Sequence, residues 1–407
     1  MSGTFKTIRD LDFAGKRVLL RADLNVPVQD GKVTDATRIE RIVPTIREII
    51  KTGGKAILIS HFGRPKGKVD KAFTLEMVVP AVADATGHPV GFVDTDWVDV
   101  SQAMRAIDSA PEGSILVLEN TRFHPGEEEN AAELVKRMAS LGDLYVNDAF
   151  SAAHRAHAST EGLAHVLPSA AGLAMEAELS ALEKGLGKPQ KPVIAIVGGA
   201  KVSTKIALLE NLVSRVDALV IGGAMANTFL LAEGVGIGRS LAERDMGDQV
   251  STILDKADKA NCAIIVPVDA TVAWKFEKNA PHRHYGLDLM DPDGMILDVG
   301  PQSIERIKGA VDEAATVIWN GPLGAFETVP FDAGTNAIAQ HVAARTKAGK
   351  LVSVAGGGDT VSALAQAGVK DQFTYVSTAG GAFLEWMEGK SLPGVEALKA
   401  SKHPTNV

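Results

Sequence analysis

Short runs of Val, Ile and Leu alternate with longer segments of helical periodicity along almost the whole chain. This alternation is typical of a parallel sheet covered by helices on both faces, because the strands of such a sheet are buried on both sides. The sequence therefore predicts an α/β fold. The expected strands span residues 17–23, 55–60, 89–93, 115–120 and 144–148 in the first half, and 192–199, 217–223, 262–269, 316–321, 350–357 and 373–381 in the second.

The length of the chain predicts two domains, because it has 407 residues and a single core rarely grows beyond about 250–300 residues. Good helix formers precede Pro189 and Pro192, a pattern that predicts a helix followed by a linker. We expect an N-terminal domain over residues 1–170, an interdomain helix and linker over 171–190, a C-terminal domain over 191–390, and a tail over 391–407 that frays or packs back on the N-terminal domain.

Charge and cysteine content exclude several classes of protein. The 42 Lys and Arg residues against 50 Asp and Glu residues give a net charge of −8, which argues against a nucleic-acid or anionic membrane surface. Cys262 is the single cysteine, so a disulfide framework and a thiolate metal site are excluded. No signal peptide or membrane-spanning apolar run is visible. We expect a cytoplasmic protein and a monomer.

One helix is predicted from Arg38 to Lys51, with Asp35 or Thr37 as its N-cap. Pro44 interrupts this helix and is expected to kink it. The apolar residues that fall on one stripe of the helix are Ile39, Ile42, Val43, Ile46, Ile49 and Ile50.

The second half contains the same motif four times, an apolar strand that ends in a Gly-Gly turn. Such a turn lets backbone N–H groups approach an anion, and the following helix directs its positive dipole end toward it. A single turn of this kind is more often a steric requirement, but four in one domain favour a nucleotide or another large phosphate ligand. The four turns lie within residues 196–205, 220–229, 354–363 and 377–386.

Two lysines, Lys201 and Lys205, follow the first of these turns. On a helix their i, i+4 spacing would project both ammonium groups from one face toward the helix N-terminus. Two solvated lysines are the alternative explanation. Because lysines usually avoid the turn directly after a buried strand, we expect them to face a bound anion.

Asp359 follows the glycines of the third turn and allows two interpretations. It could cap the helix that Thr360 begins, or it could bind Mg²⁺, which commonly takes one carboxylate together with substrate phosphates and waters. The stretch by itself favours neither. Asn320 and Glu327 follow another predicted strand and form a polar pair suited to a triphosphate edge and a ribose hydroxyl.

Arginine and histidine side chains gather at the strand ends, or at a helix start, of the first half. They are Arg38, His61, Arg64, Arg122, His154, Arg155 and His157. A solvated surface side chain is the ordinary explanation for each one alone. Their shared position predicts a small, highly anionic ligand, because arginine forks bind carboxylate or phosphate oxygens in pairs. Asp23 and Asn25, two residues apart on an extended stretch, could hold a hydroxyl of that ligand.

Other chemistries fit the sequence poorly. It contains no His-Glu-x-x-His zinc motif, no Gly-x-Ser-x-Gly elbow and no dinucleotide-binding Gly-x-Gly-x-x-Gly after a strand. No candidate general base is evident either.

Seven stretches follow one another along the chain: RADLNVP, SHFGRPKG, LENTRFHPGEEEN, NDAFSAAHRAHAST, VGGAKVSTKI, WNGPLGAFE and AGGGDT. Together they closely resemble the phosphoglycerate kinase family, from about Ile8 to Gly381. The resemblance implies two Rossmann-like three-layer domains with parallel sheets, joined by an interdomain helix and hinge. Thr204 stands where the family commonly has Asp, which removes a negative charge beside Lys205 and bears on nucleotide affinity.

The resemblance also implies roles for individual residues. The N-terminal domain would bind 3-phosphoglycerate through Asp23, Leu24, Asn25, Arg38, His61, Phe62, Gly63, Arg64, Arg122 and Arg155. The C-terminal domain would bind MgATP or MgADP through Lys205, Asn320, Glu327, Gly357, Gly358, Asp359 and Thr360, with Asp359 also on Mg²⁺. Arg38 and Lys201 would be the catalytic pair that flanks the phosphoryl group in flight.

The implied reaction is Mg-dependent, reversible phosphoryl transfer between 1,3-bisphosphoglycerate and ADP on one side and 3-phosphoglycerate and ATP on the other. A substrate carboxylate is ionised at neutral pH and needs no general base before it attacks in line. Arg38 and Lys201 would reach the same group only after hinge closure. A kinase for a different small acid and a non-catalytic two-domain metabolite sensor are the alternatives. The intact SHFGRP and HRAHAST motifs argue against the first, and the presence of Lys201, Asp359 and Arg38 against the second.

Overall fold

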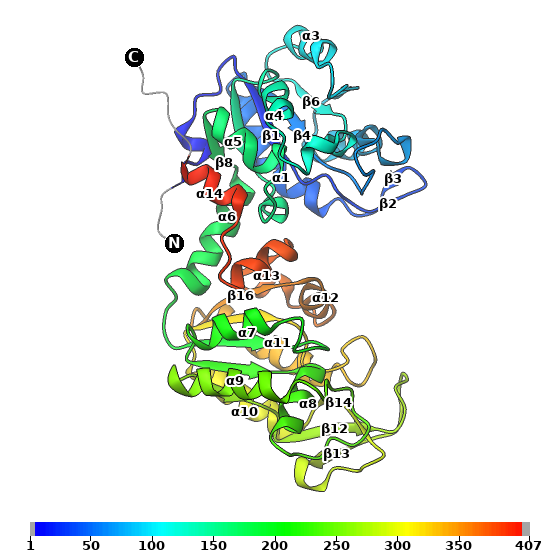
Figure 1. Cartoon of the computed structure of the whole chain (residues 1–407), viewed down its shortest axis with the longest axis vertical. Helices are drawn as coiled ribbons and strands as arrows, with labels where there is room; N and C mark the ends of the chain where they lie inside the picture. Colours follow the sequence, from blue (N-terminus) through cyan, green and yellow to red (C-terminus); the bar gives the residue numbers. More distant parts are fainter. Residues whose placement is uncertain (1–4, 401–407) are drawn as a thin grey trace. The chain divides into compact units, whose positions relative to one another are not determined.

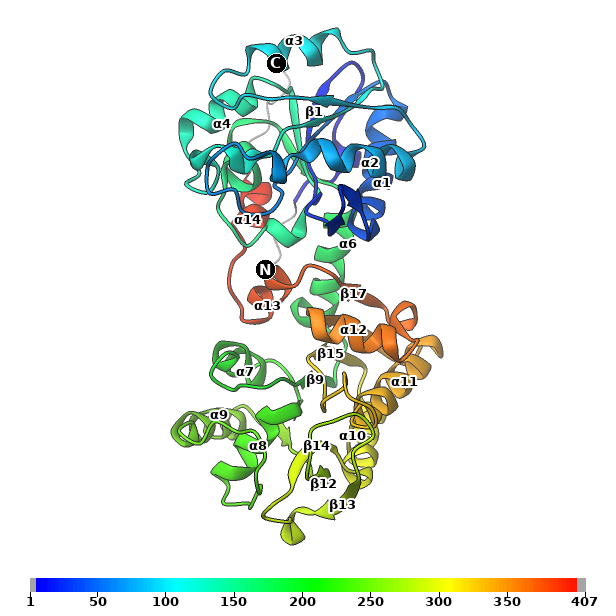
Figure 2. The ribbon, with the colours of Figure 1, turned by 90° about the vertical axis from the view of Figure 1, so that its right-hand side faces the viewer.

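The computed structural model describes residues 5–400, which form two compact units. The first comprises the described residues up to Leu179 together with the described C-terminal segment from Ser391, and the second spans Ser180–Lys390. Each unit contains a six-stranded parallel sheet with helices on its faces (Figures 1 and 2), so the predicted α/β fold is confirmed. None of the described helices combines the length and apolar character that a membrane crossing requires.

The sheet of the first unit has the strand order β5-β6-β4-β1-β7-β8. Every strand predicted for this half is present, whereas β8 and the hairpin of β2 and β3 are absent from the prediction, because strands of two or three residues carry no readable periodicity. The bounds are β1 (Arg17–Arg21), β2 (Val28–Gln29), β3 (Lys32–Val33), β4 (Lys55–Ile59), β5 (Val90–Val93), β6 (Ile115–Leu118), β7 (Leu144–Asn147) and β8 (Ser169–Ala171).

Helix α1 (Thr37–Lys51) buries its apolar stripe in the core of the first unit. Its N-cap position is occupied by Ala36, so the prediction of Asp35 or Thr37 as the N-cap residue is wrong. Asp35 lies one residue further out, where its carboxylate accepts a 2.9 Å hydrogen bond from the Thr37 N–H and stabilises the helix start. Pro44 lies inside the helix. The other helices are α2 (Val79–Thr86), α3 (Ser101–Ser109), α4 (Ala132–Ala139), α5 (Leu163–Val166), α6 (Leu173–Leu182) and α14 (Pro393–Ala400).

The chain passes from the first unit to the second through α6, which continues into the π-helical segment η8 (Glu183–Gly187). The described part of the C-terminal segment returns to the first unit, where α14 packs against α5 and β8 (Figure 1). The Gly394 N–H donates a 2.9 Å hydrogen bond to the Ala153 carbonyl. Residues 401–407 of the predicted tail lie outside the described residues.

The sheet of the second unit has the order β11-β10-β9-β15-β16-β17. Figure 2 shows α7 and α9 on one side of this sheet and α10 and α11 on the other. The strand bounds are β9 (Val193–Val197), β10 (Ala218–Ile221), β11 (Ala263–Ile265), β15 (Thr316–Asn320), β16 (Val352–Gly356) and β17 (Tyr375–Ser377). The helix bounds are α7 (Ile206–Val213), α8 (Gly223–Ala232), α9 (Gly247–Lys259), α10 (Pro301–Glu313), α11 (Ala333–Lys347), α12 (Gly358–Gln366) and α13 (Gly381–Met387).

A second, antiparallel sheet in this unit is absent from the prediction. Its order is β13-β12-β14, with β12 (Asp269–Ala273) between β13 (His282–Gly286) and β14 (Met295–Val299). The edge strand β13 begins with three exposed residues, His282, Arg283 and His284, so it lacks the apolar run by which the other strands are recognised.

Candidate functional site

The carboxyl ends of the central strands bring the predicted phosphoglycerate residues to one edge of the first sheet. In the sheet register, Arg21 at the end of β1 pairs with Ile59 of β4 on one side and with Asn147 of β7 on the other. The segments that follow these strands are therefore neighbours, and ligands of open parallel sheets bind at this edge.

Arg38 is held at this edge by the segment that follows β1. Its Nη1 lies 3.2 Å from Asp23 Oδ2 and donates a 3.0 Å hydrogen bond to the Asn25 carbonyl. Asp23 also accepts a 2.5 Å hydrogen bond from Ser151 Oγ, and Asn25 Oδ1 accepts one of 2.9 Å from the Gly63 N–H. The predicted residues Asp23, Asn25 and Arg38 thus form one hydrogen-bonded group.

Gly63 joins this group to Arg122. Its φ is +58°, and a Cβ atom there would lie 2.3 Å from the Phe73 ring, so only glycine fits. The Gly63 carbonyl accepts a 2.8 Å hydrogen bond from Nη1 of the buried Arg122, whose Nε lies 3.1 Å from Glu128 Oε1. Arg64 is exposed, and its side chain makes no hydrogen bond or ion pair within residues 5–400.

Two histidines at this edge are neutral near pH 7. Burial and then the charge of Arg21 hold the pKa of His61 well below its usual range, and Arg122 and Arg155 add to the effect. Burial and the same three arginines lower the pKa of His157 to about 4. These two histidines therefore add no positive charge to the edge near pH 7.

The sequence prediction missed Arg21, which is only 1% exposed. The sequence did contain a signal, because Arg21 lies within an apolar run that was predicted to be a buried strand. A buried charge needs hydrogen-bonding or charged partners, so such an arginine is a candidate functional residue. Leu24 and Phe62 are buried, and their N–H groups donate to Ser60 Oγ at 3.0 Å and to Asn120 Oδ1 at 3.2 Å. They shape the loops of the site.

In the second unit, the turn after β9 carries the two predicted lysines. Helix α7 begins only at Ile206, so the prediction that Lys201 and Lys205 share a helix face is wrong. The turn is held instead by Glu243, whose carboxylate accepts a 3.0 Å hydrogen bond from the Ser203 N–H and another from Ser203 Oγ. Lys201 is exposed.

Lys205 links this turn to the end of β15. Its Nζ donates a 2.6 Å hydrogen bond to the Gly198 carbonyl and one of 2.7 Å to Asn320 Oδ1. Burial lowers the pKa of Lys205 to about 8, and the charge of Asp359 opposes this shift. Lys205 is thus bonded to Asn320 and lies close enough to Asp359 to feel its charge.

The third Gly-Gly turn leads into α12, and its geometry excludes the capping interpretation of Asp359. The helix begins at Gly358 with Gly357 as N-cap, so Asp359 lies inside the first turn and its side chain makes no cap hydrogen bond. The φ of +98° at Gly357 lets the chain turn into the helix before Thr360. Thr360 Oγ1 accepts a 2.7 Å hydrogen bond from the Gly321 N–H.

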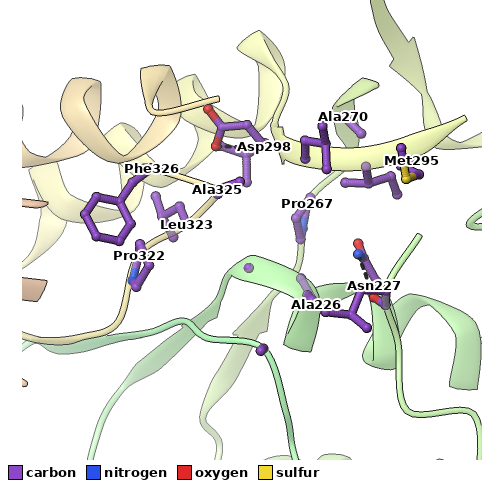
Figure 3. Close-up of a pocket in the computed structure, with 18 of the residues that line it drawn as sticks. Ala226, Asn227, Pro267, Ala270, Met295, Asp298, Pro322, Leu323, Ala325 and Phe326 are labelled. Atoms are coloured by element: carbon purple, nitrogen blue, oxygen red, sulfur yellow. Dashed lines mark hydrogen bonds between the residues drawn. The ribbon is translucent and has the colours of Figure 1, made fainter. Parts of the chain in front are cut away.

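A pocket of about 330 Å³ lies beside these turns (Figure 3). In Figure 3, Asp298, Ala270 and Met295 of the antiparallel sheet lie on one side of the pocket, and Ala226 and Asn227 of α8 lie on the other. Its lining is mainly apolar and also includes Gly199, Gly223, Leu241, Leu323, Glu327 and Asp359. Such a lining suits a flat, weakly polar ring, with polar groups at few points.

Asp298 is the buried carboxyl group of this pocket. Oδ2 accepts a 2.7 Å hydrogen bond from the Gly334 N–H in the first turn of α11, and Oδ1 accepts one of 2.9 Å from the Val299 N–H. Burial nevertheless raises the pKa of Asp298 to about 7. Both hydrogen bonds join Asp298 to backbone N–H groups, so we assign this carboxyl group a structural role in the wall of the pocket.

A model of the family described as phosphoglycerate kinase matches residues 8–390. The chain belongs to the phosphoglycerate kinase family. A phosphoglycerate kinase of Rhodopseudomonas palustris is 65% identical over 399 residues, which cover 98% of this chain and 100% of the relative. A phosphoglycerate kinase of Bradyrhizobium diazoefficiens is 64% identical with the same coverage.

Solved structures of phosphoglycerate kinases are similar to both units. The phosphoglycerate kinase of Coxiella burnetii is 42% identical with a TM-score of 0.92, and the match covers 98% of this chain and 100% of that one. The enzyme of Pyrococcus horikoshii OT3 is 29% identical with a TM-score of 0.79, covering 97% and 99%. The predicted family and the classification of the chain as a kinase are confirmed.

Proposed function

We propose that the first unit binds the phosphoglycerate and that the second binds the nucleotide. As a phosphoglycerate kinase, the chain is a phosphotransferase that moves a phosphoryl group reversibly between 1,3-bisphosphoglycerate and ADP and 3-phosphoglycerate and ATP, in glycolysis and gluconeogenesis. The observation that carries the assignment of sites is the cluster of buried or half-buried arginines around two neutral histidines at the edge of the first sheet. This charge suits a small ligand with several anionic oxygens.

Within this site, Arg122 and Arg155 supply charge for the phosphate of phosphoglycerate, and exposed Arg64 adds a donor. Asp23 and Asn25 are placed for its hydroxyl group. Since Asp23 pairs with Arg38 at 3.2 Å, binding of the hydroxyl at Asp23 would loosen this pair and leave Arg38 to the carboxylate. The same side chain could then serve the reacting end of the substrate.

The nucleotide site is built from the three turns after β9, β15 and β16. The N–H groups at the start of α12 are oriented for phosphate oxygens, and Lys205 and Asn320 lie beside them. The apolar pocket takes the base, and Glu327 at its lining takes a ribose hydroxyl. Thr204 leaves Lys205 without an adjacent carboxylate in the sequence.

The residues present fit Mg²⁺ at Asp359. This carboxylate is exposed, makes no side-chain hydrogen bond within residues 5–400, and lines the nucleotide pocket. The described residues contain no group of three or more His, Cys, Asp or Glu side chains that could hold a metal by themselves. One carboxylate together with nucleotide phosphates and water is an ordinary ligand set for Mg²⁺, which supplies charge neutralisation to the phosphates when bound.

The proposed mechanism is direct attack of the substrate carboxylate on the γ-phosphoryl group. The carboxylate is already ionised, so no residue has to remove a proton, and catalysis reduces to positioning and charge. Arg38 and Lys201 are proposed to neutralise the transferring group. Since they belong to different units, the proposal includes a hinge movement in the linker region 171–190.

Two further properties are part of the proposal. We place the enzyme in the cytoplasm, because its sequence has the single cysteine Cys262 and so no disulfide framework, a composition typical of proteins from reducing compartments. We also propose a monomer that acts on small molecules and needs neither nucleic acid nor a membrane. Its net charge of −8 supports the latter point.

A coupled assay for 1,3-bisphosphoglycerate formation from ATP and 3-phosphoglycerate, with and without Mg²⁺, tests the proposal. Arg38→Ala and Lys201→Ala should each lower kcat by about a hundredfold or more, the usual effect of removing one charge-stabilising group. The Kd of the ligand bound by the other unit should change little. Matched controls are Arg47→Ala, an exposed arginine on the same helix α1, and Lys259→Ala at the end of α9. Unchanged kcat in either test variant would remove that residue from the mechanism.

A further inference from the structure

A chain of buried polar groups lies behind His61 in the first unit. Its other members are Glu127 at the end of η5 (Pro125–Glu127), Ser159 in the π-helical turn η7 (Ala158–Gly162), and Arg21 at the end of β1. Glu127 is 0% and Arg21 is 1% exposed. Two opposite charges buried this deeply are costly unless their hydrogen bonds are complete. The proposed mechanism assigns no step to Glu127, Ser159 or Arg21.

Hydrogen bonds connect these four side chains in series, from Glu127 to His61. The Glu127 carboxylate accepts hydrogen bonds from Ser159 N at 3.0 Å and Ser159 Oγ at 2.5 Å. Ser159 Oγ in turn accepts from Arg21 Nε at 3.0 Å, and Arg21 Nη2 lies 2.9 Å from His61 Nδ1. Tyr145 Oη donates a 2.8 Å hydrogen bond to the Ser159 carbonyl and fixes the backbone of the serine.

The donor and acceptor roles decide where the proton of His61 resides. A guanidinium group can only donate, so His61 Nδ1 has to be the acceptor of the bond from Arg21. The ring is neutral near pH 7, because burial and then the charges of Arg21, Arg122 and Arg155 lower its pKa. The single ring proton is then on Nε2. Nε2 has no hydrogen-bond partner in the part of the chain that the structure describes.

We propose that Glu127 is a positioning residue that, through Ser159 and Arg21, selects the Nε2–H tautomer of His61 and directs this N–H to an oxygen of phosphoglycerate. The inference deepens the proposed phosphoglycerate site and rests on it for the identity of the ligand. The three residues behind the ring act through His61 and have no contact with the reacting atoms in this proposal.

The tautomer matters because the ligand is anionic. An imidazole that presented the Nε2 lone pair would repel the oxygens of phosphoglycerate, whereas Nε2–H donates a hydrogen bond to them. Without the Glu127 charge, the buried Arg21 guanidinium would have no carboxylate behind Ser159, and Ser159 Oγ would lose the anionic acceptor that leaves its lone pairs free for Arg21 Nε. The guanidinium would then shift toward other acceptors, and His61 would lose the bond that orients it.

The direct test is nitrogen-15 NMR of the imidazole groups in the full-length, ligand-free protein. The His61 signal is assigned by its loss in His61→Gln, and long-range proton–nitrogen correlations distinguish protonated from unprotonated ring nitrogens. We expect protonated Nε2 and unprotonated Nδ1. A protonated Nδ1 in the wild-type protein overturns the inference, while the activity assay remains a separate test of the proposed function.

The role of Glu127 is tested by Glu127→Gln, which removes the charge, and by Ser159→Ala, which breaks the chain and keeps the backbone N–H bond to Glu127. Each should give a mixture of His61 tautomers and raise the KM for 3-phosphoglycerate about tenfold, the size of one weakened hydrogen bond to a charged ligand. The kcat and the KM for ATP should stay within about twofold of wild type, because the chain orients a binding residue only. Glu129→Gln is the matched control, because Glu129 is exposed.

Two results would contradict this role. If the two variants fold and keep both the wild-type tautomer and the wild-type KM, Glu127 does not position His61. Should Glu127→Gln fail to fold, Ser159→Ala alone decides the question. Saturating 3-phosphoglycerate should also shift the Nε2–H signal of the wild-type protein, and an unchanged signal would show that this N–H does not meet the ligand.

Discussion

Replacing Gly357 with alanine should weaken nucleotide binding far more than it weakens the fold. Gly357 has φ +98° and ψ +141°, a backbone conformation that residues other than glycine rarely adopt. A Cβ atom there would lie 2.7 Å from Asn320 Nδ2, closer than side-chain contacts permit, so Asn320 has to move. Asn320 is the residue that accepts the 2.7 Å hydrogen bond from Lys205.

The expected magnitudes follow from these two effects. The backbone strain costs about 1–3 kcal/mol of stability. The shift of Asn320 also leaves Lys205 without the acceptor that positions its ammonium group. Weakening one charged hydrogen bond from Lys205 to the nucleotide costs about 1.5–3 kcal/mol of binding free energy, which corresponds to roughly a tenfold to hundredfold rise in the Kd for MgADP. Gly368→Ala is the matched control, because Gly368 follows the same helix α12 with φ +70° and has open space where its Cβ would lie.

The assay combines urea unfolding with calorimetric titration of MgADP. Intrinsic fluorescence reports mainly on the second unit, since three of the four tryptophans, Trp274, Trp319 and Trp386, belong to it. Both variants should unfold at lower urea concentration, and only Gly357→Ala should lose affinity. If the two variants have the same Kd within about twofold, the close approach of Gly357 and Asn320 does not control the nucleotide site.

Two further predictions concern carboxylates of the second unit. Asp359→Asn should abolish the Mg²⁺ dependence of nucleotide affinity and lower the thermal midpoint of unfolding by no more than about 4 °C, since Asp359 makes no cap hydrogen bond and its charge in the first turn of α12 contributes only about 0.3–1 kcal/mol. Calorimetry with and without Mg²⁺ measures this, and retained Mg²⁺ dependence would refute the metal role. The pKa of Asp298 is raised to about 7, so between about pH 4 and 7 the unfolded chain releases a proton that the native state keeps. The free energy of unfolding should therefore fall as pH rises through this window. Asp298→Asn should flatten the fall in urea titrations, and an equal slope in both proteins would contradict the assignment.

Much of the fold could be predicted from local sequence. Apart from the three-residue strand β8, the strands of both parallel sheets lie where the apolar runs occur, because a strand buried on both faces is usually apolar throughout. The antiparallel sheet is absent from the prediction because two of its strands lack an apolar run. The edge strand β13 begins with exposed polar residues, and the buried central strand β12 contains Asp269 and Thr271. Hydrophobic periodicity reflects which side chains are buried, so a strand with mostly exposed side chains shows little periodicity in the sequence.

The local conformation of the phosphate-binding turns could not be predicted. The spacing of Lys201 and Lys205 suggested a helix, but residues far along the chain hold them in a turn, including Glu243. Similarly, aspartate is a residue type that often caps helices, but α12 begins at Gly358, before Asp359, because Gly357 with its positive φ takes the N-cap position. In both cases a glycine or a distant partner overrides the helical preference of the short segment.

The sequence by itself determined the order of elements, the family, and the chemical inventory of each strand end, because these depend on residues that are close together in the chain. Only the tertiary structure decided which of these residues contact one another and which protonation states they have. Glu127, Ser159, Arg21 and His61 come from four separate segments, and no spacing connects them. Hydrogen-bond roles and pKa shifts depend on distance and burial in space, and these are set when the strands align and bring their ends to one edge.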